Sequence, residues 1–175
     1  HLLRNEGPML NYGAIWALTC VVPTGQLIMP WGEGTPDAGD TMGWRTQMIR
    51  YWRRWAGTDA HPQSNQWVVR DDHFLVEPTG ETGKVGLYGE LGILAQLRPE
   101  GTFIKRAKAR EGVTYPDGGC NIEIYTSGSF MEMETLSPLL TLHPGQTLTH
   151  EESWILTEEV IAPADWTRLL ALTTR

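Results

Sequence analysis

The chain has 175 residues and a formal net charge of −7, with 14 lysines and arginines against 21 aspartates and glutamates. Hydrophobic residues make up 41% and charged residues 20%, a composition typical of folded globular proteins rather than disordered ones. Proteins that bind nucleic acids or anionic membrane surfaces have an excess of Lys and Arg, which this chain lacks. No apolar run approaches the length of a membrane span, about 20 residues. We therefore expect neither a nucleic-acid partner nor a membrane partner.

Short strands separated by turn signals are predicted from the start of the chain. The apolar run 14–22 and the segment 26–30 flank a Pro-Thr-Gly turn, which predicts a buried hairpin. Residues 31–43 are rich in Gly, Pro and Asp and predict a loop.

The middle of the chain continues in the same way. Residues 67–77 predict two short strands around Asp71-Asp72, and residues 84–88 and 90–97 predict a hairpin around Gly89. A further strand is expected over 102–108, after a Pro-Glu-Gly turn.

The last third predicts more paired strands and one helix. Segments 120–126 and 129–136 are expected to pair around Ser127-Gly128, while 139–142 and 146–156 flank a His-Pro-Gly turn. A helix is expected only after Pro163, where apolar residues recur at helical spacing. The chain is thus predicted to be mainly β, as one antiparallel β-sandwich domain over residues 1–175 with a short C-terminal helix.

The hairpin after residue 120 carries the main functional candidates. Side chains alternate across a strand, so one face of this hairpin is apolar and the other collects carboxylates. A loop at 126–129 predicts three facing pairs: Tyr125 with Phe130, Glu123 with Glu132, and Asn121 with Glu134. Facing carboxylates repel each other, so a cation, a proton or a ligand must offset them, and Lys84, Lys105 and Arg106 are the candidate cations. The alternative is a solvated face with ordinary Glu–Lys pairs.

The turn before the hairpin, Tyr115-Pro116-Asp117-Gly118-Gly119, has two interpretations. Proline presets φ and glycine permits positive φ, so a purely structural turn accounts for it. The alternative is that Tyr115 and Asp117 lie at the rim of a binding site.

Eight tryptophans are many for a chain of this length. Trp16 and Trp154 lie in apolar patterns and are interpreted as core residues. The better ligand candidates lie in or near predicted loops: Trp31, Trp44, Trp52 and Trp55. Four interleaved arginines favour cation–π packing within the protein over single-stranded nucleic-acid binding, because the chain is acidic.

Metal-binding and redox patterns are absent from the sequence. The five histidines show no HxxxH spacing, and we expect no metal and no cofactor. Cys20 and Cys120, the two cysteines, lie in apolar runs and are interpreted as buried thiols, with a disulfide as the alternative.

Several motifs resemble the galactose mutarotase-like superfamily. In the C-terminal third they are residues 130–136 (FMEMETL), 144–146 (PGQ) and 150–154 (HEESW). An uncharacterised bacterial branch of that superfamily is similar over most of the chain, at residues 5–7 (NEG), 16–19 (WALT), 84–87 (KVGL), 103–106 (FIKR) and 115–123 (YPDGGCNIE).

The resemblance implies a supersandwich fold that binds sugars on the concave face of its larger sheet. The family domain is longer, so we expect an incomplete copy, whose missing strands another segment or an oligomer could supply. By analogy with the Glu-Thr-Gln motif of aldose 1-epimerases, Glu134 is the catalytic base. Asn121, Glu123 and Glu132 would then hold sugar hydroxyls, and Lys84, Lys105 or Arg106 would balance their charge.

One departure from the family leaves two functions open. Epimerases have an Asn-His pair in the segment that corresponds to residues 11–16, where this chain reads NYGAIW without a histidine. That histidine is the general acid of the family reaction. The chain is therefore predicted to be an aldose epimerase or mutarotase, or alternatively a non-catalytic carbohydrate-binding or accessory structural domain. The resemblance is compatible with a bacterial cytoplasmic or periplasmic location.

Overall fold

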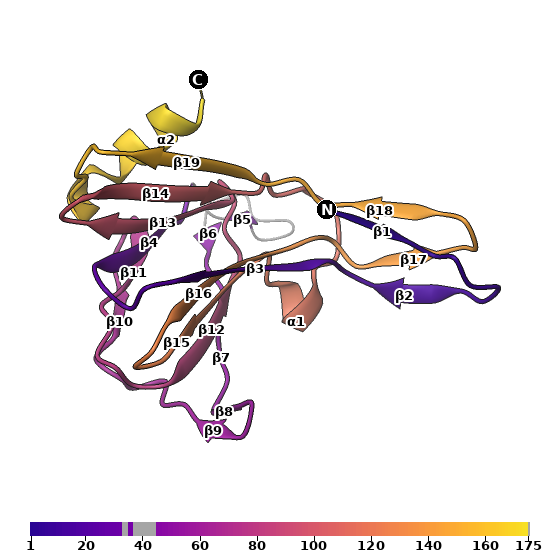
Figure 1. Ribbon diagram of the computed structural model, residues 1–175, viewed down its shortest axis with the longest axis horizontal. Coiled ribbons are helices and arrows are strands. Elements are labelled where there is room, and N and C mark those ends of the chain that lie inside the picture. Colours follow the sequence, from indigo (N-terminus) through magenta and orange to yellow (C-terminus); the bar gives the residue numbers. More distant parts are fainter. Residues whose placement is uncertain (33–34, 37–44, 175) are drawn as a thin grey trace.

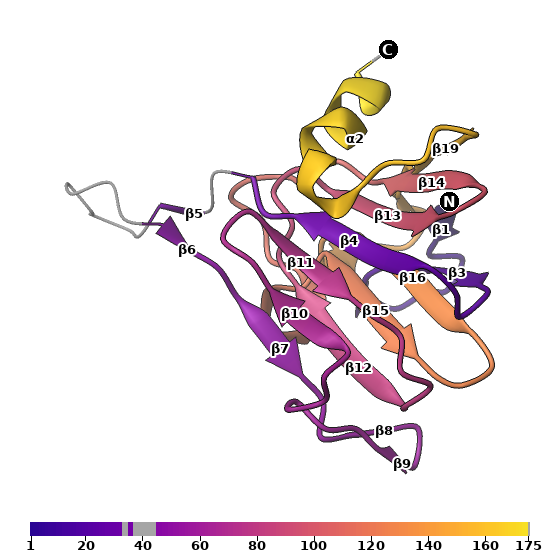
Figure 2. The ribbon, with the colours of Figure 1, turned by 90° about the vertical axis from the view of Figure 1, so that its left-hand side faces the viewer.

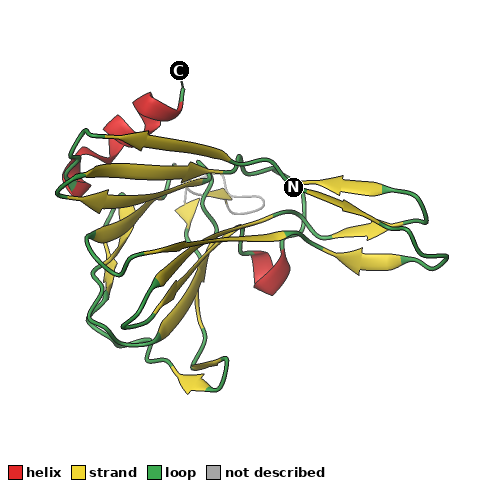
Figure 3. Cartoon of the chain, in the orientation of Figure 1, coloured by secondary structure: helices red, strands yellow, loops and turns green. Residues whose placement is uncertain are grey.

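The computed structural model describes residues 1–32, 35–36 and 45–174. It is mainly antiparallel β, with 44% of residues in strands and 9% in helices, which confirms the predicted fold class at that level. Figure 3 shows how few helices accompany the strands. Among the helices described, none is long and apolar enough to span a bilayer.

Two large antiparallel sheets form the body of the molecule (Figures 1 and 2). The six-stranded sheet has the order β10-β11-β4-β13-β14-β19. Its strands are β4 (Gln26–Pro30), β10 (Trp67–Val69), β11 (His73–Val76), β13 (Ile93–Arg98), β14 (Gly101–Arg106) and β19 (Ser153–Thr157). The five-stranded sheet has the order β3-β16-β15-β12-β7. Its strands are β3 (Trp16–Val21), β7 (Ile49–Tyr51), β12 (Gly83–Leu87), β15 (Ile122–Thr126) and β16 (Met131–Leu136).

Pairs of short strands extend from this body. Strands β1 (Leu2–Arg4) and β18 (Thr147–Thr149) form one pair, and β2 (Asn11–Gly13) and β17 (Leu140–Leu142) another; together they project to the right in Figure 1. Elsewhere β5 (Thr35–Pro36) pairs with β6 (Arg45–Thr46), and β8 (Arg54–Trp55) with β9 (Thr58–Asp59).

The main core lies between the two large sheets. Leu27, Phe74, Val85, Ile124 and Met133 belong to it, and each is completely buried. These residues come from both sheets and alternate along their strands with residues of the opposite face. The face of the five-stranded sheet that carries the carboxylates therefore points away from this core.

The C-terminal helix covers the other face of the six-stranded sheet (Figure 2). As predicted, helix α2 (Trp166–Thr173) follows a short 3-10 turn that begins at Pro163. Its buried Leu169 packs with Ile28, Leu75 and Ile104 in a second apolar cluster. Strand β4 is thus covered on both faces, which explains its unbroken apolar sequence.

Two of the predicted hairpins are wrong, while a third is confirmed. Strands β15 and β16 pair as predicted. The two short strands predicted around Asp71-Asp72 are also present, as β10 and β11, and they pair with each other. However, β3 and β4 belong to different sheets, and so do β12 and β13. The turns at 22–25 and 88–92 carry the chain from one layer to the other, and sequence alternation alone cannot separate such a connection from a hairpin.

Candidate functional site

A buried ion cluster lies on the outer face of the five-stranded sheet. Lys84, Glu123 and Glu134 come from the neighbouring strands β12, β15 and β16, and each is at most 1% exposed. Lys84 Nζ lies 2.8 Å from Glu123 Oε2 and donates a hydrogen bond to Glu134 Oε2. Of the three candidate cations, Lys84 is the one that lies at the facing glutamates and offsets their charge. The alternative prediction, that these side chains lie on a solvent-exposed face, is wrong because all three are buried.

The predicted register of the hairpin is wrong by two residues. Glu123 faces Glu134, and Tyr125 faces Glu132. The loop consists of Ser127 to Phe130, closed by a hydrogen bond from Ser127 N to Phe130 O, and not of residues 126–129. Moving the loop by one residue shifts the pairing by two but keeps every side chain on its predicted face.

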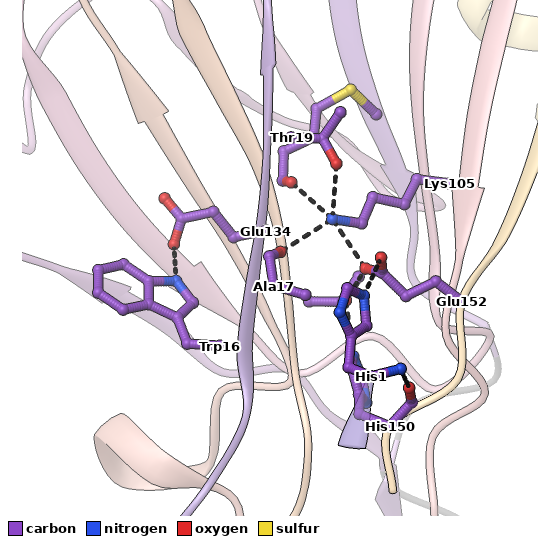
Figure 4. Close-up of polar contacts among 10 residues, drawn as sticks. His1, Trp16, Ala17, Thr19, Lys105, Glu134, His150 and Glu152 are labelled. Carbon is purple, nitrogen blue, oxygen red and sulfur yellow. Dashed lines mark hydrogen bonds and ion pairs between the residues drawn. The ribbon is translucent and has the colours of Figure 1, made fainter. Parts of the chain in front are cut away.

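Three tryptophan rings surround the Lys84 ammonium group. Its Nζ lies 5.0 Å from the ring centroid of Trp16, 5.9 Å from that of Trp52 and 4.8 Å from that of Trp55. Trp16 Nε1 also donates to Glu134 Oε2 (Figure 4). Cation–π contacts of this kind are strengthened where water is excluded.

The structure corrects the interpretation of several tryptophans. Trp52 and Trp55 lie at the site as ligand candidates should, whereas Trp31 is buried in the core. Trp16 was expected in the core but is 44% exposed and lies over the carboxylates, and Trp154 is also exposed on edge strand β19. Trp44 lies outside the residues that the structure describes.

Each of the two facing glutamates has an oxygen without a partner. The Oε1 atoms of Glu123 and Glu134 are both buried and make no hydrogen bond in the described part of the chain. Burial raises the pKa of Glu123 to about 8, although the nearby Lys84 opposes the shift. A protonated Glu123 carries no charge near neutral pH, so its repulsion with the carboxylate across the sheet is relieved.

A pocket of about 160 Å³ opens beside this cluster. Glu123 lies in its lining, together with Trp16, Trp55 and Asp117, the last of which belongs to the turn α1 (Pro116–Gly119). Asp117 adopts the left-handed φ of 51°, which is rare for a residue other than glycine. Ala14, Pro116, Leu136 and Leu139 supply apolar walls. Ligand access to the cluster is therefore through Glu123, because Glu134 does not line the pocket.

Two of the predicted sugar-binding residues have structural contacts instead. The Asn121 side chain accepts a hydrogen bond from Gly89 N and donates one to Gly89 O, which fixes the turn after β12. The Tyr115 hydroxyl accepts a hydrogen bond from Arg110 N, and the ring lines cavities other than the tryptophan pocket. Glu132 shares the face of Glu134 but is partly exposed, and burial followed by the neighbouring Glu134 raises its pKa.

Lys105 and Arg106 do not balance the outer cluster. Lys105 lies between the sheets, where Nζ donates to Ala17 O (2.8 Å), Met133 O (2.9 Å) and Thr19 Oγ1 (3.0 Å) and pairs with Glu152 Oε1 (2.8 Å). Figure 4 shows Trp16 and Glu134 on one side of the strands, with Lys105 and Glu152 on the other. Arg106 faces the opposite way and donates to Thr173 O. Both cations were predicted to lie next to the hairpin, but their strand β14 belongs to the six-stranded sheet and not to the sheet of the hairpin.

Glu152 connects Lys105 to a further polar group. Thr135 Oγ1 donates to Glu152 Oε1 and lies 2.8 Å from His150 Nε2. His1 Nε2 lies 3.0 Å from Glu152 Oε2. Lys105 has four partners, and both oxygens of Glu152 have partners. Because these polar groups are already hydrogen-bonded within the protein, we interpret the network as structural.

Neither cysteine is in a disulfide. Cys120 is buried as predicted, and burial raises the pKa of its thiol to about 12. Cys20 is exposed, contrary to expectation, because β3 is an edge strand and Cys20 lies on its outer face. Within the described residues no group of three or more His, Cys, Asp or Glu is placed to hold a metal.

The raised pKa of Glu123 predicts a pH-dependent contribution to stability. Between an ordinary value of 4.5 and about 8 the folded state keeps a proton that the unfolded state loses. The stability that this proton provides is present below the unfolded pKa and is lost as the pH rises through the folded pKa. The free energy of unfolding should therefore fall with pH relative to a Glu123→Gln variant, by up to about 1.4 kcal/mol per pH unit.

Urea unfolding of both proteins from pH 5 to pH 8.5 measures this difference. Glu111→Gln, which changes an exposed glutamate, is the control and should leave the pH dependence of the wild type intact. Parallel curves for the wild type and Glu123→Gln would show that Glu123 is ionised throughout.

Comparison with known proteins adds no relative: no family model, no curated protein and no solved structure matches the chain. The functional argument therefore rests on the geometry of the site.

Proposed function

We propose that the chain is a carbohydrate-binding protein, and that the pocket between Trp16, Trp55 and Glu123 binds a single aldose. The observation that supports this most is a carboxyl group in the lining of a pocket whose walls include two indole rings. Indole rings present an apolar face on which the C–H face of a sugar stacks, and carboxyl oxygens bind its hydroxyls. Asp117 offers a second carboxylate in the lining of the same pocket.

The size of the pocket favours a monosaccharide. Its volume of about 160 Å³ is below the about 300–1,000 Å³ of sites for drug-sized ligands. One pyranose ring is therefore a better match than an oligosaccharide. The Oε1 atoms of Glu123 and Glu134 are buried and have hydrogen-bonding capacity that no described residue uses.

Mutarotation is a second candidate function of the same pocket, and the pKa of Glu123 favours it. Opening an aldose ring requires an acid at the ring oxygen and a base at the anomeric hydroxyl. Protonated Glu123 would donate to the ring oxygen as the C1–O5 bond breaks, and Asp117, the other carboxylate in the pocket lining, would accept the hydroxyl proton as C1=O1 forms. Glu134, the base that the family resemblance implies, does not line the pocket. Closure on the other face of C1 returns both protons, so the step is balanced. Glu123 would then replace the histidine that serves as acid in epimerases.

Calorimetric titration with glucose, galactose, mannose and xylose tests binding. We expect saturable binding of at least one aldose, weakened about tenfold or more by Trp55→Ala, which corresponds to about 1.4 kcal/mol of lost contact. Trp154→Ala is the matched control, since it removes an exposed tryptophan on the other sheet. Equal affinities for the wild type and Trp55→Ala would place the sugar elsewhere.

Polarimetry on the bound aldose separates the two candidate functions. A rate above the spontaneous one that falls at least about a hundredfold in Glu123→Gln indicates mutarotation with Glu123 as acid. Binding without any rate increase indicates a carbohydrate-binding module.

A further inference from the structure

A second, more cationic cavity lies at one end of the sandwich, away from the triad of Lys84, Glu123 and Glu134. It has a volume of about 330 Å³ and lies between the segment that follows β14 and the segment that precedes β19. Lys108, Arg110 and His150 line it, together with Thr149 and Glu151. It is twice as large as the tryptophan pocket and shares only Leu136 with it.

Although the chain is acidic, cationic residues are concentrated in one segment beside this cavity. Four of its 14 lysines and arginines fall within residues 105–110: Lys105, Arg106, Lys108 and Arg110. The first two have the protein partners described above. The side chains of Lys108 and Arg110 are exposed, and no ion pair or side-chain hydrogen bond of theirs occurs among the residues that the structure describes. Both therefore retain their full capacity to bind an anion.

His150 adds a buried hydrogen-bonding group to the same cavity. The residue is 7% exposed, and its Nε2 is occupied by Thr135 Oγ1 at 2.8 Å. Its Nδ1 makes no hydrogen bond within the described ranges, although the ring lines the cavity. The backbone on either side of His150 is fixed, because His150 N and O both bond to His1. The imidazole is thus a positioned group with one free nitrogen.

A larger cavity adjoins this one across a shared wall. Arg110 and Tyr115 line both, and the neighbour has a volume of about 510 Å³ with Met48, Tyr88 and Val113 in its lining. The buried Tyr115 is held by Arg110 N, so the wall between the two cavities is ordered by the same loop that carries the cations. The first cavity carries the cations, and the second adds the apolar and aromatic side chains of Met48, Tyr88 and Val113.

We propose that the cavity of Lys108, Arg110 and His150 binds the anionic group of a small organic molecule, a phosphate ester or a carboxylate, whose uncharged part extends along Tyr115 into the adjoining cavity. Arg110 and Lys108 supply the charge. Thr135 gives its proton to Glu152, so His150 Nε2 donates to Thr135 Oγ1 and the free Nδ1 accepts a hydrogen bond from a hydroxyl group of the ligand, such as the P–OH of a singly ionised phosphate ester. Glu151, also in the lining, limits the site to one compact anion, because its carboxylate repels further negative charge. This inference does not rest on the sugar pocket.

Titration of the full chain with inorganic phosphate, phenyl phosphate and benzoate at constant ionic strength tests the proposal. We expect saturable phosphate binding, and tighter binding of the anion that carries an aromatic ring. The double variant Lys108→Met/Arg110→Met should weaken every anion at least about tenfold. Arg70→Met removes an exposed arginine of the six-stranded sheet region and should change nothing.

The arms of the experiment also identify the anion. Tighter binding of phenyl phosphate than of benzoate indicates a phosphate ester, and the reverse order indicates a carboxylate. Trp55→Ala should leave anion binding intact, which distinguishes this site from the sugar pocket. Absence of saturable binding, or equal affinities in the wild type and the double variant, would overturn the proposal. Because both mutated side chains are exposed, the circular dichroism spectrum and melting curve should match those of the wild type.

Discussion

Replacing Lys84 by methionine should lower the free energy of unfolding by about 3–5 kcal/mol, because it leaves two facing buried glutamates without their cation. Methionine keeps the length of the aliphatic stem, so little packing is lost. What is lost at pH 7 is the ion pair to Glu134, the 2.8 Å contact with the protonated Glu123 and the cation–π contacts to three tryptophans. Protonation of Glu123 offsets part of the cost, since the pKa of this residue is already raised by burial.

Urea denaturation at pH 7 measures the effect of Lys84→Met. Lys108→Met is the matched control, because Lys108 is exposed, and its effect should stay within about 0.5 kcal/mol. Adding Glu134→Gln to Lys84→Met should restore part of the stability, since it removes one of the two uncompensated carboxyl groups. A loss below about 1 kcal/mol would mean that the lysine contributes little to holding the cluster.

Lys105→Met is expected to have an effect of similar size, about 3–5 kcal/mol, for a different reason. Lys105 is completely buried between the sheets and joins strands of both, through the carbonyls of Ala17 and Met133 and the carboxylate of Glu152. Burial lowers the pKa of Lys105, while Glu152 opposes that shift and keeps the charge paired. Without the ammonium group, two strand carbonyls lose a donor and Glu152 loses its nearest cation.

The test of Lys105→Met is the same denaturation, with Lys105→Met/Glu152→Gln as the compensating double variant. The double variant should be more stable than Lys105→Met alone, because a neutral amide replaces an unpaired buried carboxylate. Near-ultraviolet circular dichroism reports whether the sheets still pack. If Lys105→Met unfolds at the same urea concentration as the wild type, water or another group replaces the lysine.

Much of the local structure could be predicted because side chains alternate along strands. Alternation placed Glu123 and Glu134 on one face and Ile124 and Met133 on the other, and both assignments hold. The charge of the glutamates alone implied that a cation, a proton or a ligand must offset them, and Lys84 is such a cation. The terminal helix followed from its apolar spacing and from Pro163.

The contacts between layers could not be predicted in this way. Lys84 and Lys105 look alike in sequence, yet β12 and β14 belong to different sheets, so one lysine faces outward and the other inward. Trp16 reads as a core residue because its neighbours are apolar, but β3 is an edge strand and its outer face is open. The hairpin register depended on whether the loop begins at residue 126 or at residue 127, and both fit the same turn residues.

The central claim is that an aldose binds between Trp16, Trp55 and Glu123, and the indole N–H resonances of the tryptophans test it most directly. Each of the eight tryptophans gives one such signal, which single Trp→Phe variants assign. We expect the Trp16 and Trp55 signals to shift saturably as the aldose that binds in calorimetry is added. The signal of Trp154, which lies on the other sheet and does not line the pocket, should stay in place. Shifts confined to other tryptophans, or no saturable shift with any aldose, would contradict the proposed site.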